Sequence, residues 1–75
     1  MQKWEYLFVT ADYALGAWRS RFENDLEVVN WKQGQNIAAY ANKKGQEGWE
    51  LITASYSSIT SGSPVPRLVF KRPIS

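Results

Sequence analysis

The stretch that decides the fold is Asn42-Lys43-Lys44-Gly45-Gln46-Glu47-Gly48-Trp49-Glu50-Leu51. Just before this stretch, apolar residues recur at the spacing of one helix face, at Ile37, Tyr40 and Ala41. Lys43 and Lys44 suit the last turn of that helix, and Gly45 stands where a left-handed cap would sit. Gly48 allows a second tight bend before Trp49. The stretch therefore predicts that a helix of about ten residues, too short to persist alone, gives way to a strand.

Segments on either side of this stretch have the composition and alternation of strands. Residues 3–11 are rich in aromatic and β-branched types, and residues 18–23 alternate between two faces. Asn24-Asp25 favours a tight turn, after which residues 26–29 could run back as a short hairpin arm. The other expected elements are a connection at residues 12–16, strands at residues 49–58 and 65–72, a polar loop at residues 60–64 and an end at Pro73.

Length and composition bound the architecture. The chain has 75 residues without cysteine or histidine, so it cannot be stabilised by a disulfide or by a zinc site with these ligands. Its aromatic residues, 15% of the chain, supply the material for a packed core. With no internal repeat or linker, we expect a single domain spanning residues 1–75. Its fold class would be α+β, a small antiparallel sheet of about four strands in the order β-β-α-β-β with one short helix packed on one face.

The charge of the chain is nearly balanced, at a formal net +2. Residues 67–75 hold three basic side chains and no acid, so the basic excess is a local feature of the C-terminal end. No apolar run approaches the roughly 18 residues that a membrane span needs, and acidic residues interrupt the apolar stretch near the N-terminus. We therefore expect a cytoplasmic protein with no membrane contact.

Three segments together resemble a known family: Lys3-Trp4-Glu5-Tyr6, residues 42–51 and Phe70-Lys71-Arg72-Pro73. The chain is similar to the small bacterial and phage proteins catalogued as domain of unknown function 4177, which begin K-W-E-Y, carry N-x-x-G-x-E-G-W-E-L-V and finish with F-K-R-P. This chain departs from the short members by inserting residues 14–33. The resemblance implies a small α+β fold with the first strand, the helix and the last two strands. It implies no chemistry.

The motif residues have an interpretation that needs no ligand. Glycines at a helix end first of all allow backbone conformations with positive φ that other residues rarely adopt. A tryptophan directly after them would lie between helix and sheet. We therefore expect this motif to determine the fold rather than to form a binding site. Its residues are Trp4, Gly45, Gly48, Trp49 and Glu50.

Composition also bears on catalysis. Acid–base or nucleophilic chemistry at neutral pH usually needs a histidine, a cysteine or a perturbed carboxylate in a cleft, and the first two are absent. The acidic cluster Glu23-Asn24-Asp25 with Glu27 lacks the ligand spacing of a calcium loop. We expect no enzyme activity, no catalytic residue, no metal site and no cofactor.

The predicted helix is too small to cover the predicted sheet. A sheet of four strands has an area of roughly 480 Å² on each face, whereas a helix of about ten residues covers roughly 150 Å². Yet alternate residues of the first strand place Trp4, Tyr6 and Phe8 on one side and Leu7 and Val9 on the other, so both sides need cover. We expect a non-catalytic binding domain that self-associates through the second face of its sheet or an unpaired edge strand, as a homo-oligomer and most simply a dimer.

Two other classes of ligand remain as alternatives. The first is a small molecule or nucleotide that would be sequestered by stacking on tryptophan and by neutralising phosphate. Its expected residues are Trp18, Arg19, Arg21, Trp31 and Lys32. The second is single-stranded nucleic acid, bound by Arg67, Lys71 and Arg72. Glu5, Glu23 and Glu50 dilute the positive field, so the composition disfavours nucleic acid.

Overall fold

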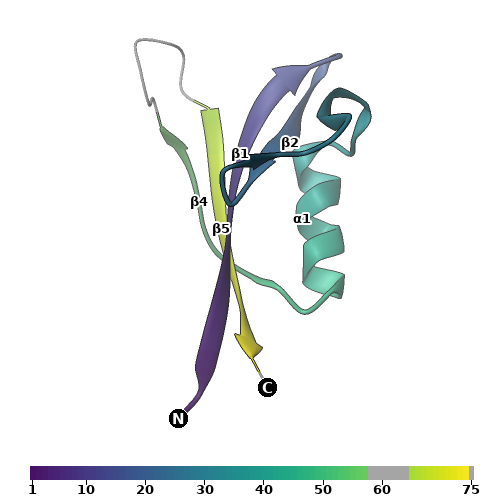
Figure 1. Ribbon diagram of the computed structural model, residues 1–75. Helices are drawn as coiled ribbons and strands as arrows, with labels where there is room; N and C mark the ends of the chain where they lie inside the picture. The colour runs from purple at the N-terminus through teal and green to yellow at the C-terminus, as the bar shows by residue number, and fades with distance from the viewer. Residues whose placement is uncertain (58–64, 75) are drawn as a thin grey trace.

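The computed structural model of the chain describes residues 1–57 and 65–74, so the loop predicted at residues 60–64 lies outside the described residues. Five antiparallel strands form one sheet in the order β3-β2-β1-β5-β4, and helix α1 lies on one side of it (Figure 1). In chain order the elements are β1 (Lys3–Ala14), β2 (Ala17–Glu23), β3 (Leu26–Glu27), the 3-10 helix η1 (Trp31–Gln33), α1 (Ile37–Gln46), β4 (Glu50–Ser57) and β5 (Val65–Ile74).

The α+β class, the antiparallel sheet and the single α-helix agree with the sequence prediction. The predicted count of about four strands in the order β-β-α-β-β is corrected to five strands in the order β-β-β-α-β-β. The additional strand is the short arm β3, which pairs with the end of β2 across a turn at Asn24 and Asp25. Both turn residues have positive φ, 49° and 69°, as a tight two-residue hairpin requires.

The connection predicted at residues 12–16 is shorter in the structure. β1 continues to Ala14, which pairs with Ala17, so only Leu15 and Gly16 form the turn. Both of these residues have positive φ, 51° and 82°. Leucine rarely adopts this conformation, and its side chain therefore gave no signal for a turn at this point.

The end predicted at Pro73 is also wrong, because β5 continues two residues beyond the predicted last strand residue, Arg72. β5 runs through Pro73, which pairs with Trp4, to Ile74. β4 begins at Glu50, opposite Lys71, so beyond that point β5 is accompanied by β1 alone among the described strands. Proline is tolerated there because a strand without a second neighbour has no ladder hydrogen bond to lose on that side.

The C-terminal end of α1 corrects the predicted role of one glycine. Gly45 lies inside the helix, and the left-handed residue is Gly48, with φ +95°. The Trp49 N–H donates to the Lys44 carbonyl at 3.0 Å, and the Gly48 N–H donates to the Gly45 carbonyl at 3.1 Å. These two bonds form a Schellman motif, which satisfies carbonyl groups that would otherwise be free at the helix end.

The core lies between α1 and the side of the sheet that faces it. Leu7 and Val9 of β1 pack there with Leu68 and Phe70 of β5 and with Tyr40 of the helix. Ile37, Ala41 and Trp49 are partly buried against this cluster. Because side chains alternate along a strand, the residues between these positions on β1 point to the opposite side of the sheet.

We expect Gly48→Ala to lower the free energy of unfolding by about 1–2 kcal/mol, because a Cβ disfavours the left-handed conformation at this position. Gly45→Ala is the matched variant, since a Cβ there meets nothing within 4 Å and the residue is helical. It should raise the stability by about 0.5–1 kcal/mol. Urea unfolding of both variants measures the two effects, and equal shifts in the same direction would contradict this assignment of the cap.

Candidate interaction surface

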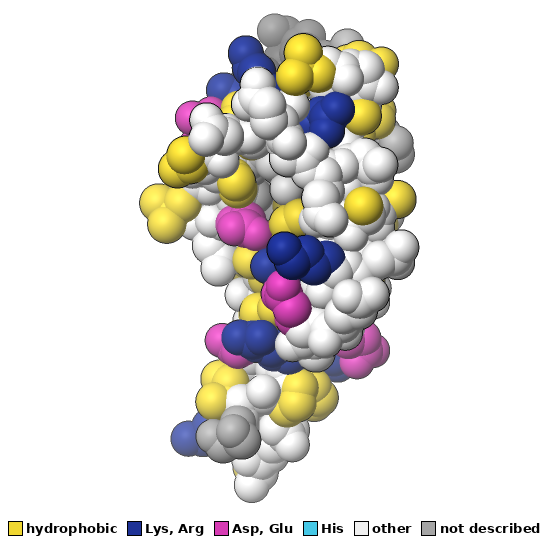
Figure 2. Space-filling model, turned by 90° about the vertical axis from the view of Figure 1, so that its right-hand side faces the viewer, with side chains coloured by type: hydrophobic (Ala, Val, Ile, Leu, Met, Phe, Trp, Pro, Cys, Tyr) yellow, Lys and Arg dark blue, Asp and Glu magenta, His cyan; other side chains and the backbone are white. Residues whose placement is uncertain are grey.

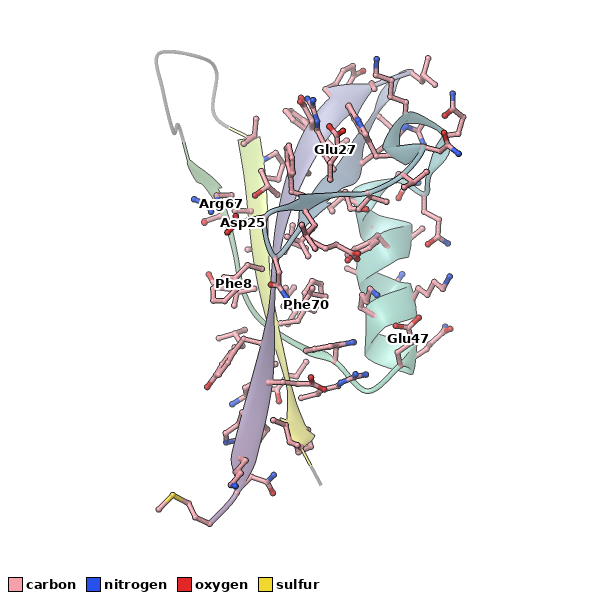
Figure 3. The ribbon with its side chains drawn as sticks, in the orientation of Figure 1. Phe8, Asp25, Glu27, Glu47, Arg67 and Phe70 are labelled. Atoms are coloured by element: carbon pink, nitrogen blue, oxygen red, sulfur yellow. The ribbon has the colours of Figure 1, made fainter. Side chains whose placement is uncertain are left out.

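The side of the sheet opposite α1, which we call the open face, exposes a row of aromatic side chains. Trp4, Tyr6 and Phe8 are 39%, 49% and 53% exposed, although all three belong to the long strand β1. Figure 3 shows Phe8 on the side away from α1 and Phe70, which is 1% exposed, on the side toward it. No helix of the described residues covers the open face (Figure 1).

Residues of β5 and β4 complete the open face. By register, Lys71 lies beside Tyr6, Val69 beside Phe8 and Arg67 beside Thr10. The Lys71 ammonium is 4.4 Å from the centre of the Trp4 ring, a cation–π contact. Glu50 of β4 is the register partner of Lys71, so the open face carries both signs of charge at this end.

Phe8 lines an open hollow on this face. The hollow is also lined by Tyr6, Asn24, Asp25 and Arg67. Asn24 is held there firmly, because its main-chain N–H donates to the Phe8 carbonyl at 2.8 Å and its side-chain oxygen accepts from the Phe8 N–H at 2.9 Å. Figure 3 shows Asp25 and Arg67 on the same side of the sheet as Phe8. From the sequence Asp25 is expected to be a turn residue, since no local pattern indicates that this turn lies beside β1.

The shape of the molecule is elongated for its size. Its accessible surface is 5290 Å², whereas scaling with mass gives about 4,700 Å² for a monomeric protein of this size. The radius of gyration is 12.8 Å, against about 11 Å for a compact chain of this length. The two measures agree that the chain leaves more surface uncovered than a typical monomer.

The residues predicted for a small-molecule site lie around β2 and η1, away from the centre of the open face. Arg21 stacks on Trp31 at 4.9 Å, and the Lys32 ammonium lies 5.9 Å from the same ring. Trp31 is only 9% exposed. Arg21 also pairs with Asp12 at 2.8 Å and with Glu27 at 2.9 Å. These three predicted residues are therefore brought together, but by contacts within the chain.

The other two predicted residues of that site have contacts of their own. Arg19 donates to the carbonyl groups of Ala14, Leu15 and Gly34, which ties the β1–β2 turn to the segment after η1. Trp18 meets Tyr13 edge to face, with 5.4 Å between ring centres. A guanidinium that already donates three hydrogen bonds would have to give some of them up to bind a phosphate.

The residues predicted for nucleic acid are divided between the two sides of the sheet. Arg67 and Lys71 lie on the open face, whereas Arg72, one position further, lies on the side of α1. There Arg72 stacks on Trp49 at 4.2 Å and pairs with Glu5. The three cations therefore do not form one basic surface.

The three segments that carry the family resemblance meet at this point. Glu5 comes from the first segment, Trp49 from the second and Arg72 from the third. Arg72 also donates to the Glu47 carbonyl at 3.4 Å, which fastens the end of α1 to the sheet. Figure 2, a view of the α1 side, shows basic and acidic side chains in contact across the lower part of this surface. This geometry agrees with a structural role for the motif.

A buried tyrosine links α1 to β2. The Tyr40 hydroxyl donates to a carboxylate oxygen of Glu23, and the Lys44 ammonium lies 3.8 Å from the same oxygen. Burial, and then the hydrogen bond and charge of Glu23, raise the pKa of Tyr40 well above its ordinary value. Tyr40 therefore keeps its proton in the folded protein at pH values where a solvated tyrosine loses it.

This shift predicts a loss of stability at high pH. The folded pKa of Tyr40 lies above the unfolded value near 10, so the contribution is complete below about pH 10 and falls as pH rises beyond it. One such group changes the free energy of unfolding by up to about 1.4 kcal/mol per pH unit. Tyr40→Phe should remove most of this slope, whereas Tyr13→Phe, at an exposed tyrosine, should keep it. Urea unfolding at pH 9 to 11 measures the slopes, and equal slopes in both variants would refute the assignment.

Comparisons with protein-family models, curated proteins and solved structures give no match. The resemblance to domain of unknown function 4177 therefore stays a prediction that rests on the three segments. Among the described residues, no helix is long and apolar enough to cross a membrane. The described part of the chain also holds no group of three acidic, histidine or cysteine side chains placed to bind a metal ion.

Proposed function

We propose that this protein is a non-catalytic binding domain that self-associates through the open face of its sheet. The observation that carries the proposal is the row of Trp4, Tyr6 and Phe8, each at least 39% exposed on a strand whose other side is buried. Aromatic side chains gain more from burial than other types, and contiguous exposed apolar surface marks interaction sites.

The balance of charge on the open face supports a protein partner over a polyanion. Arg67 and Lys71 supply two positive charges, and Asp25 and Glu50 supply two negative charges. A surface that binds nucleic acid needs a net positive field along the phosphate backbone. A surface that carries both signs in equal number can instead be complementary to a copy of itself.

The area that the chain leaves uncovered supports the same partner. Each chain exposes about 600 Å² more than scaling predicts for a monomer. Two copies that each hid this excess would bury about 1,200 Å² in total, which is the lower limit of stable protein interfaces.

Sedimentation equilibrium tests the proposal. The wild-type chain should be dimeric at tens of micromolar, and Phe8→Ser should raise the dimer dissociation constant about tenfold or more, because truncating a central aromatic anchor commonly costs about 2 kcal/mol. Since Phe8 is 53% exposed in the single chain, the fold should persist, which circular dichroism will show.

Val29→Ser is the matched control for this experiment. Val29 is 85% exposed in the segment between β3 and η1, so the variant removes an exposed apolar side chain elsewhere on the molecule. It should leave the dimer unchanged. A wild-type chain that sediments as a monomer, or a Phe8→Ser variant as dimeric as wild type, would exclude the open face as the self-association surface.

A further inference from the structure

We propose that the second copy docks on the open face about a two-fold axis parallel to β1, so that Arg67 of each chain faces the partner's Asp25. This inference rests on the proposed function and adds the orientation of the pair and the charges that specify it.

The two charges flank Phe8 on opposite sides of β1. Arg67 belongs to β5, where its register partner is Thr10, two residues beyond Phe8. Asp25 follows Asn24, whose main chain and side chain both bond to Phe8 along the other edge of β1. Among the described residues, no ion pair or side-chain hydrogen bond is formed by the side chain of Arg67 or Asp25, although both line the hollow beside Phe8.

A face-to-face dimer of sheets can have its two-fold axis in one of two principal directions. An axis that runs parallel to the strands along β1 exchanges the two sides of the sheet, so β5 of one chain lies over the β2 side of the other. Arg67 then approaches the side of the partner's sheet that carries Asp25, and the same contact occurs twice. Aligned sheet packing, with strand directions within about 30° of each other, allows this arrangement.

An axis perpendicular to the strands keeps the sides and exchanges the ends. β5 then lies over β5, and an axis near Val69 brings Arg67 onto the partner's Lys71, since these residues stand two positions before and two after Val69. This arrangement repeats a like-charge contact twice, which selects against it. The charge pattern therefore distinguishes the two directions and favours the parallel axis.

A third arrangement would pair the exposed edges of two β4 strands. Its two-fold axis is normal to the sheet, so it extends the sheet sideways and leaves Arg67 and Asp25 without a partner in the dimer. It would also leave Trp4, Tyr6 and Phe8 exposed. Charge reversal on the open face separates this arrangement from the proposed one, because it should not affect an edge-to-edge pair.

The experiment uses complementary charge reversals measured by sedimentation equilibrium and native mass spectrometry. Arg67→Glu and Asp25→Arg should each raise the homodimer dissociation constant about tenfold or more, because each places two like-charge pairs in the interface. An equimolar mixture of the two variants should form a heterodimer with close to wild-type affinity, since both contacts are then opposite in charge. The double variant in one chain should dimerise again for the same reason.

Two further variants guard against indirect effects. Asp25 has φ +69°, so Asp25→Asn removes the charge with a residue that tolerates this conformation, and it should weaken the dimer less than Asp25→Arg. Lys43→Glu reverses an exposed cation on α1, outside the open face, and should leave the dimer unchanged.

The outcomes separate this inference from the function on which it rests. If Phe8→Ser breaks the dimer but the charge reversals do not, or if the mixture fails to recover it, the open face is the interface and the proposed orientation is wrong. If Lys43→Glu weakens the dimer as much as Arg67→Glu, the effect is one of net charge and the specific pair is refuted. If the wild-type chain is monomeric, both proposals fail.

Discussion

The rest of the structure depends on the need of β1 for cover on both of its sides. Leu7 and Val9 are buried under α1 together with Phe70, whereas Trp4, Tyr6 and Phe8 point the other way and remain 39–53% exposed. A helix of ten residues is long enough to cover the middle of one side only. The chain therefore folds into a two-layer domain that still exposes aromatic side chains on one sheet surface, and the self-association that we propose would cover them.

Two adjacent residues of β5 contact tryptophans on opposite faces of the sheet. Lys71 lies over Trp4 on the open face, and Arg72 lies over Trp49 on the face of α1. Each tryptophan is thus partly shielded by a cation from the same strand, and Glu5 balances the charge of Arg72. This arrangement brings motif residues from three separate segments of the sequence together, and it joins the helix end to the paired strands β1 and β5.

The strands and the helix followed from residue periodicity, because alternation and helical spacing are local properties of the chain. The division of Lys71 and Arg72 between two faces is a consequence of the same alternation. Other features depend on contacts that periodicity does not contain. Either Gly45 or Gly48 could have ended the helix, and the choice depends on how far main-chain hydrogen bonding continues past Lys44. Asp25 became part of the open face only because Asn24 bonds to Phe8 on a neighbouring strand.

The strand order also constrains when the sheet can form during synthesis. β5 follows the other described strands in the sequence, yet it lies between β1 and β4, and Lys3 of β1 pairs with Ile74 of β5. The hairpins of β1, β2 and β3 can form while the chain is still emerging from the ribosome, but β4 has no described neighbour other than β5. Pairings of such long sequence separation are slow to close. A nascent chain therefore leaves β4 and one edge of β1 unpaired until β5 has been made.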